Sequence, residues 1–212
     1  MTSSQQYFAE VAGQWDALRS GFFTEAMRDD AIRRAQLPQS AVVADVGTGT
    51  GFVLQGLLPH AARLVGFDAS AEMLAVAQDN MRDAVLAGAQ VELRRAEGAA
   101  LPAEDGTFDA VFANMYLHHA PNPAQTIVEM ARVLRPGGRL VISDLDSHDQ
   151  VWMREEMADT WLGFAREDVR GWFETAGLRA VSVDDAAGTC DCCDAPSQEA
   201  ISLSVFLAMG TK

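Results

Sequence analysis

Three glycines at alternate positions mark the part of the sequence best suited to binding a small ligand. Gly47, Gly49 and Gly51 follow the apolar run of residues 41–46 and precede a short apolar helical pattern. Glycine has no Cβ, so such a turn lets backbone N–H groups approach a ligand closely where a strand gives way to a helix. A dinucleotide-binding turn would need glycine at position 52, which is Phe52 here. The loop therefore favours a small uncharged or zwitterionic group over a pyrophosphate.

Two acidic residues follow the next two apolar runs and are candidates for holding a nucleoside. Asp68 lies 68 − 45 = 23 residues beyond Asp45, the acid that precedes the glycines. An acid at the tip of the second strand can accept hydrogen bonds from both hydroxyls of a ribose, whereas the alternative is a solvated surface carboxylate. Glu97 follows the third run and can accept from an adenine amino group, while the amide of Gly98 donates to the ring.

Histidines and acids also follow the fourth and fifth apolar runs. The candidates for acid–base work are His118, His119, Asp144 and His148. A histidine titrates near neutral pH, and a neighbouring carboxylate can orient it. Packing of the Leu-His-His segment is the alternative for the first two. We assign catalytic roles to His119, His148 and Asp144, to be used where the substrate must lose a proton.

Three cysteines crowd into four positions near the end of the chain. Cys190, Cys192 and Cys193 lie in a segment rich in acids, with no lysine or arginine over residues 180–211. Thiols and carboxylates at one rim suit a soft metal or metalloid, so all three are candidate metal ligands. The alternative is a surface loop without a ligand, because Cys-x-Cys-Cys lacks the paired spacing of a structural zinc site.

The charge and composition of the chain limit the kinds of partner that it can bind. The 212 residues carry 16 basic and 30 acidic side chains, a net charge of −14, and Lys212 is the only lysine. Such a chain is repelled by phosphate backbones, so we expect no nucleic-acid partner. No apolar run approaches the ~20 residues that span a bilayer, and the polar start is unlike a signal peptide. We therefore expect a cytoplasmic protein with no membrane partner; the sequence does not reveal its oligomeric state.

The spacing of apolar residues predicts strands alternating with helices. We expect an N-terminal helical region over residues 4–36 with a break near Ser20-Gly21, and helices over 71–87 (capped by Ser70), 123–134, 149–160 and 167–176. Strands are expected over residues 41–46, 64–67, 91–94, 108–113 and 140–143, with a stop and turn at 135–138. The last two strands, 178–183 and 200–208, form a hairpin around the cysteine loop. The alternation predicts right-handed βαβ units and a parallel sheet.

An ordered set of short motifs over residues 7–145 resembles the class I S-adenosylmethionine-dependent methyltransferases, of the type that acts on ubiquinone and menaquinone precursors. The motifs are Val43–Gly51, Leu64–Asp68, Ala71–Leu74, Glu97–Pro102, Phe108–Val111, Leu117–His119 and Leu134–Gly138. The resemblance implies an α/β fold: a Rossmann-like, doubly wound seven-stranded sheet, mostly parallel with an antiparallel last strand and helices on both faces. It also implies S-adenosyl-L-methionine as the cofactor.

The same resemblance assigns roles to individual residues. It places the methionine end of the cofactor near Asp45, Gly47, Thr48, Gly49 and Gly51, the ribose on Asp68, and the adenine against Ala69, Glu97 and Gly98, with Met73, Asn114, Met115 and Tyr7 also in the site. Tyr7 belongs to a helical lid over residues 1–37. Residues 38–212 then form the methyltransferase domain, which closes with the hairpin 178–209.

These observations predict an enzyme that transfers a methyl group from S-adenosylmethionine to a small molecule. The tail from Asp144 to Lys212 is similar to methyltransferase domains joined to arsenic-type repressors, so a thiol-bound metalloid such as arsenite is one candidate acceptor. A rival is a non-catalytic cofactor-binding domain whose cysteines sense metal or redox state. A nucleotide-dependent oxidoreductase is the third reading, and Phe52 argues against it.

Overall fold

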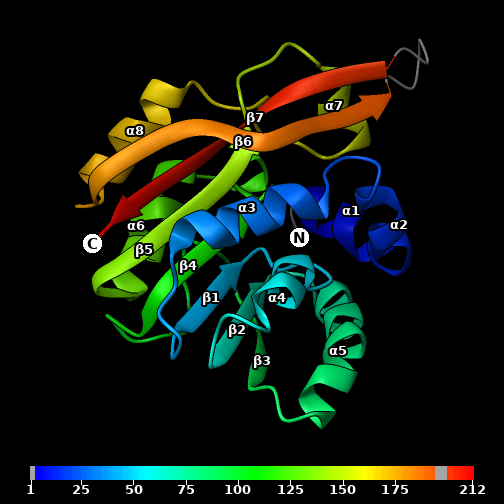
Figure 1. Ribbon diagram of the computed structural model, residues 1–212. Helices are drawn as coiled ribbons and strands as arrows, with labels where there is room; N and C mark the ends of the chain where they lie inside the picture. The colour runs from blue at the N-terminus through cyan, green and yellow to red at the C-terminus, as the bar shows by residue number, and fades with distance from the viewer. Residues whose placement is uncertain (1–2, 194–199) are drawn as a thin grey trace.

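A seven-stranded sheet forms the centre of the molecule (Figure 1). The computed structural model describes residues 3–193 and 200–212. The strands are β1 (Val42–Val46), β2 (Arg63–Asp68), β3 (Val91–Arg95), β4 (Phe108–Asn114), β5 (Leu134–Leu145), β6 (Arg179–Cys193) and β7 (Ala200–Thr211). Their order is β3-β2-β1-β4-β5-β7-β6, with β7 antiparallel to β5 and to β6. The predicted mostly parallel sheet with an antiparallel last strand is confirmed.

Helices cover both faces of this sheet. They are α1 (Ser3–Val11), η1 (Ala12–Gln14), α2 (Trp15–Arg19), α3 (Glu25–Ala35), α4 (Phe52–Leu57), α5 (Ala71–Leu86), η2 (Leu117–His119), α6 (Pro123–Val133), α7 (Trp152–Glu156) and α8 (Arg166–Thr175). Successive strand residues point to opposite faces, so Val43 packs with α3 and α4 while Ala44 packs with α6 and α8. The helices α1 and α2 lie apart from both layers, beside α5 (Figure 1).

Local chemistry explains where the helices beside the sheet begin. The Ser70 side chain accepts a hydrogen bond from the N–H of Met73 and so caps α5, as the sequence predicts. Asn122 caps α6 in the same way, and Pro123 occupies the first turn of that helix, where its missing N–H costs nothing. These caps fix the ends of the loops that follow β2 and β4, which are the loops that carry the candidate ligand-binding residues.

Two predicted elements have different lengths in the structure. Strand β5 begins at Leu134, not at 140, because Leu134 already pairs with Phe108 before a register shift brings Arg139 opposite Ala110. The predicted helix 149–160 shrinks to α7. It starts late because the N–H groups of Ser147 and His148 donate to the carbonyls of Phe164 and Leu162, which holds this segment extended.

The predicted cysteine loop is also wrong. Strand β6 extends to Cys193, and Cys190 pairs with Leu203 of β7 in the antiparallel ladder. The ladder resumes at Thr189 after a register shift that follows Asp185, so the strand continues past the acidic residues that suggested a turn. None of the helices described by the structure is long and apolar enough to cross a membrane.

Candidate active site

The glycine turn after β1 is built from local hydrogen bonds. The hydroxyl of Thr48 donates to Asp45 Oδ2 at 2.6 Å, and the N–H groups of Gly47 and Thr48 donate to the carbonyl of Phe67 at 2.8 and 3.0 Å. Gly47 has φ +71°, and a Cβ there would overlap the ring of Tyr116. The position therefore requires glycine for both its backbone angle and its neighbour.

Asp68 lies at the tip of β2 and holds the turn in place. Its two carboxylate oxygens accept hydrogen bonds from the N–H groups of Gly49 at 2.8 Å and Ser70 at 2.9 Å. Burial raises the pKa of Asp68 above its ordinary value, and these backbone donors oppose that shift. Each oxygen has a second lone pair, so this carboxylate can also accept from ligand hydroxyls.

The loop after β3 packs against Tyr116 and the N-terminal helix. Gly98, whose N–H is expected to donate to an adenine ring, lies so close to the Tyr116 hydroxyl that a Cβ at this position would overlap it. The Glu97 carboxylate accepts a hydrogen bond from the side chain of Gln5, in α1. Sequence reasoning missed Tyr116, whose ring spans from the glycine turn to the β3 loop and walls the site on that side. The only signal was a large aromatic residue directly after Asn114 and Met115.

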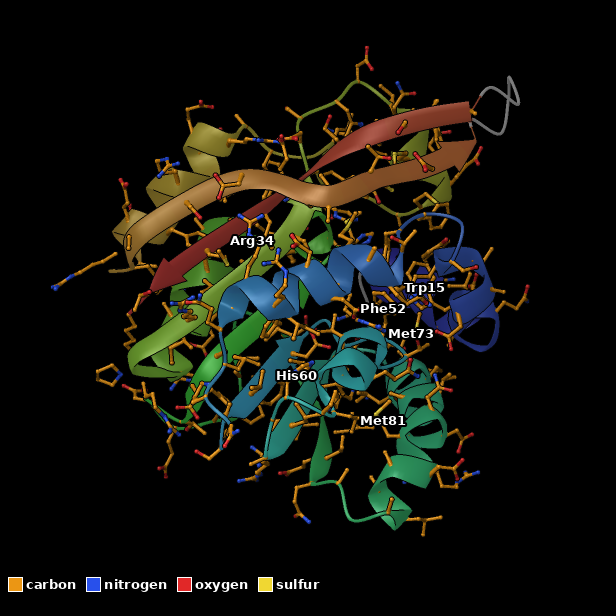
Figure 2. The ribbon with its side chains drawn as sticks, viewed as in Figure 1. Trp15, Arg34, Phe52, His60, Met73 and Met81 are labelled. Carbon is orange, nitrogen blue, oxygen red and sulfur yellow. The ribbon has the colours of Figure 1, made fainter. Side chains whose placement is uncertain are left out.

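These loops and the N-terminal helices line a cavity, which we call the first cavity. Nine of the thirteen predicted cofactor residues line it: Gly47, Thr48, Gly49, Asp68, Ala69, Met73, Glu97, Asn114 and Met115. Figure 2 shows Trp15, Phe52 and Met73 gathered where the N-terminal helices meet α4 and α5.

The other four predicted cofactor residues support the first cavity from behind. Asp45 is buried and holds Thr48, and Gly51 is the N-cap of α4 with φ +90°. Gly98 packs against Tyr116, as described above. The hydroxyl of Tyr7 points to Met157 Sδ at 3.7 Å, so its neighbour Phe8, not Tyr7, is the aromatic residue of α1 that lines the cavity.

A second, more apolar cavity adjoins the first. The five residues Phe8, Trp15, Phe23, Met115 and His119 line both. The second cavity is otherwise walled by Phe22, His118, Leu145, Trp152, Met153, Met157, Asp159 and Cys190. It is therefore built by residues from both ends of the chain, with the Leu-His-His segment between them.

His118 and Asp144 form a buried pair beneath the second cavity. His118 Nδ1 lies 2.7 Å from Asp144 Oδ1, and the other oxygen of Asp144 accepts from the N–H of Leu117 at 2.7 Å. Burial alone would lower the pKa of His118, but the carboxylates of Asp144 and Asp159 outweigh it and raise that pKa to about 9. Asp144 thus holds a charged His118 and does not itself line either cavity.

His119 differs from His118 in its charge state. Its pKa is well below the ordinary value because the ring is buried and lies beside His118, at 4.1 Å between ring centres. Its Nδ1 lies 3.3 Å from the carbonyl oxygen of Ala158, which can only accept, so Nδ1 carries the proton and Nε2 keeps its lone pair. Phe8 packs edge-on against the ring at 4.8 Å. A neutral imidazole therefore stands at the junction of the two cavities.

Asp159 completes this cluster and was not found from the sequence. One of its oxygens lies 3.8 Å from both His118 Nε2 and His119 Nδ1, and the other has no hydrogen-bond partner among the described residues. Burial raises the pKa of Asp159 to about 6, which the charge of His118 partly offsets. Asp159 thus lies between the two histidines, and with His118 protonated the three side chains form an ion-pair network.

His148 and the cysteines end up in different surroundings from those expected. His148 accepts from the N–H of Gln150, and it lines neither cavity. Cys190 is buried, 3% exposed, and lines the second cavity. Cys192 and Cys193 belong to β6, but their side chains lie outside the described part of the chain. The structure therefore brings one of the three predicted metal ligands to the site.

The hydrogen-bond acceptors around the first cavity fit the chemistry of S-adenosylmethionine. Asp68 and Glu97 at one end match ribose hydroxyls and an adenine amino group, both of which donate. Behind the glycine turn, Asp45 Oδ1 is buried without a hydrogen-bond partner in the described residues, and burial raises the pKa of Asp45 to about 7. A positively charged ligand near this carboxylate would relieve that cost. Fold and site together define a class I nucleoside-binding methyltransferase architecture.

Comparisons with known proteins agree with this architecture. Residues 44–142 match the family described as a methyltransferase domain. A phosphatidylethanolamine N-methyltransferase from Cereibacter sphaeroides is 34% identical over 143 residues, which are 67% of this chain and 68% of that protein. The chain therefore belongs to the S-adenosylmethionine-dependent methyltransferase family.

One further relative and one solved structure are also similar to this chain. A demethylmenaquinone methyltransferase from Lactiplantibacillus plantarum is 36% identical over 126 residues, 58% of this chain and 53% of that protein. The crystal structure of YcgJ from Bacillus subtilis superposes with a TM-score of 0.74 at 19% identity, covering 89% of this chain and 99% of that one. The chain spans about half the length of several curated relatives that it matches.

Proposed function

We propose that this protein transfers a methyl group from S-adenosylmethionine, held in the first cavity, to a small molecule held in the second. The observation that carries the proposal is the shared wall: His119 and four apolar residues line both cavities. A methyl donor and its acceptor must lie in contact with the reacting atoms aligned, and two adjoining cavities meet that need. The net charge of −14 argues against a nucleic-acid substrate.

Different residues have roles in cofactor binding, in excluding water and in proton transfer. Bound S-adenosylmethionine supplies an electrophilic methyl group on its sulfonium. Asp68 accepts from the ribose hydroxyls, while Phe8, Trp15 and Phe23 exclude water from the space between the cavities. His119, through Nε2, would accept the proton that the acceptor loses when it takes up the methyl group.

The other predicted residues act on the cavity from outside. We assign Asp144 a positioning role, because it fixes His118 and the backbone of the Leu-His-His segment. His148 has a supporting role, since the N–H of its residue helps to hold the segment that carries Trp152. The helical region 1–37 acts as a lid over both cavities, through Phe8 and Trp15. We place the reaction in the cytoplasm, where a buried cysteine such as Cys190 stays reduced.

The wall of the second cavity suggests the kind of acceptor. Most of it is aromatic or aliphatic, which fits a quinone precursor or another apolar ring. Cys190, Met153 and Met157 add three sulfur atoms to the same wall, and this observation favours a soft metalloid as the second candidate.

The test is a product assay with radiolabelled methyl donor. Purified protein is incubated with S-adenosylmethionine and, in separate reactions, a demethylated hydroquinone, a primary amine and arsenite. We expect a methylated product from one acceptor and S-adenosylhomocysteine in equal amount. Binding of S-adenosylhomocysteine without turnover of any acceptor class would favour the non-catalytic rival, and no binding would contradict the proposal altogether.

A further inference from the structure

Arg19 is a buried cation at the edge of the first cavity for which the sequence offered no role. It ends α2, is 8% exposed and lines the first cavity. Its Nε and Nη1 are buried and find no hydrogen-bond partner in the part of the chain that the structure describes. Burying a charge without partners is costly, so such a group is expected to meet one when the site is filled.

The surroundings hold the guanidinium flat and leave its edge for a ligand. Its carbon lies 3.8 Å from the centre of the Phe52 ring and 5.7 Å from that of Phe23. The nearest acid on the same helix, Asp16, is already engaged by the hydroxyl of Thr50 at 2.6 Å and by Asn80 at 3.0 Å. Stacking on an aromatic face covers a guanidinium plane but satisfies none of its N–H donors.

The cavity is therefore polarised from end to end. Asp68 and Glu97 line it at the β2 and β3 loops, whereas Arg19 is the one lysine or arginine among its described lining residues. Phe52, on which Arg19 stacks, begins α4 on the other side of the glycine turn. A ligand that fits this polarity has hydroxyl or amino donors at one end and an anionic group at the other.

We propose that Arg19 is a carboxylate-binding residue, and that the carboxylate is the one on the amino-acid end of the cofactor. This inference rests on the proposed function, because it takes the first cavity as the cofactor site. The planar donors of a guanidinium match the two oxygens of a carboxylate and bind it more strongly than a neutral donor does. The second cavity, which holds the acceptor, does not include Arg19 among its lining residues.

Calorimetric titration with two nucleosides tests the assignment. S-adenosylhomocysteine carries the amino-acid end, and 5′-methylthioadenosine lacks it. For Arg19→Met we expect affinity for S-adenosylhomocysteine to fall about 10- to 100-fold, with affinity for 5′-methylthioadenosine unchanged. Arg28→Met is the matched control: Arg28 also stacks on Phe52, at 4.8 Å, but pairs with Asp29 and does not line the cavity. The control should bind both nucleosides like the parent.

The outcomes separate this inference from the proposed function. If the parent protein binds neither nucleoside, the proposed function falls and takes the inference with it. A second outcome is that the parent protein binds both nucleosides while Arg19→Met lowers the affinity for neither of them, or for both equally. In that case Arg19 does not bind the cofactor carboxylate, and only this inference is overturned. Arg19→Lys, which keeps the charge but not the planar fork, should lie between parent and Met variant. A selective loss for S-adenosylhomocysteine supports the assignment.

A stability measurement distinguishes a ligand role from a structural one. Without ligand, Arg19→Met should unfold at the same temperature as the parent or higher, because it removes an unpartnered buried charge and keeps an apolar side chain on Phe52. With saturating S-adenosylhomocysteine, the rise in unfolding temperature should be smaller for the variant than for the parent. A lower unfolding temperature in the ligand-free variant would overturn the inference.

Discussion

The two cavities meet at one wall, but they are constructed in different ways. Around the first cavity, the tips of the first two strands hold one another: Thr48 donates to Asp45, three residues before it, and Asp68 accepts from the N–H groups of Gly49 and Ser70. Around the second, Phe8, His119 and Cys190 come from an N-terminal helix, the loop after β4 and strand β6. Cofactor binding should therefore tolerate changes in the second cavity, whereas acceptor chemistry depends on contacts that span the chain.

Replacing His119 should have the largest effect on turnover of all these substitutions. Because it should change cofactor affinity little, it also distinguishes the role of the second cavity from that of the first. For His119→Ala we expect turnover to fall by about 10²- to 10⁴-fold, the usual contribution of a positioned general base. Affinity for S-adenosylhomocysteine should change only a few-fold, since the polar contacts of the nucleoside are elsewhere. Steady-state kinetics and calorimetry measure the two quantities. His60→Ala, at an exposed histidine outside both cavities, is the control. Unchanged turnover would remove His119 from the chemistry.

Breaking the buried pair under the second cavity should cost stability in a pH-dependent way. The pKa of His118 is about 9 in the folded protein, against about 6.5 when unfolded, so the stabilisation is complete below about pH 6.5 and is lost as the pH rises through 9. Asp144→Asn should lower the unfolding free energy at pH 6 by about 3 kcal/mol.

Denaturant unfolding of this variant over pH 6–10 provides the measurement. The parent should lose stability across this window, and Asp144→Asn should not, because its His118 is no longer held charged by that carboxylate. Asp149→Asn, at an exposed acid on the same segment, serves as the control. Parallel pH curves for parent and variant would show that the pair does not set the titration of His118.

In the first cavity, Asp68 should matter for binding more than for the acceptor. Asp68→Asn keeps the shape but removes the charge that receives the ribose hydroxyls, so we expect S-adenosylhomocysteine affinity to drop by the ~1.5–3 kcal/mol of hydrogen bonds to a charged group. Calorimetry with Asp79→Asn, an exposed acid of α5, as control makes the comparison. Affinity equal to the parent's would exclude Asp68 from the ribose contact.

Cys190 should give the smallest effect on cofactor binding and the sharpest test of the second cavity. Cys190→Ala removes a buried sulfur from that wall only, so S-adenosylhomocysteine affinity should stay the same and stability should fall by about 1 kcal/mol. Arsenite should then lose any effect on the variant if it binds at this thiol, as followed by the arsenite-induced shift in unfolding temperature. An equal shift in parent and variant would exclude Cys190 as a soft-ligand contact.

The first cavity could largely be predicted because its geometry is local. The glycine turn, Asp68 and Glu97 each follow a strand at short range, and parallel strands bring their carboxyl ends to one edge of the sheet. Nine predicted cofactor residues consequently line that cavity. What local signals did not reveal there is Tyr116, a side chain from a distant loop that packs against Gly47 and Gly98.

The roles of the remaining site residues are not indicated by the residues near them in the sequence. Arg19 looks in the sequence like any arginine on an amphipathic helix, and Asp159 like one acid among thirty. Their significance comes from burial without partners, which depends on what the rest of the chain places around them. The extension of β6 to the cysteines was likewise missed, because pairing with β7 overrode the acidic residues that favour a turn.

The sequence by itself determined the class of fold, the glycine loop and the strands that carry it, because periodicity, caps and glycine turns act over a few residues. The tertiary structure alone decided which side chains share the second cavity, which histidine is charged and which is neutral, and that Arg19 faces the cofactor cavity. These properties depend on desolvation and on the charges of residues distant in sequence, and burial sets their strength.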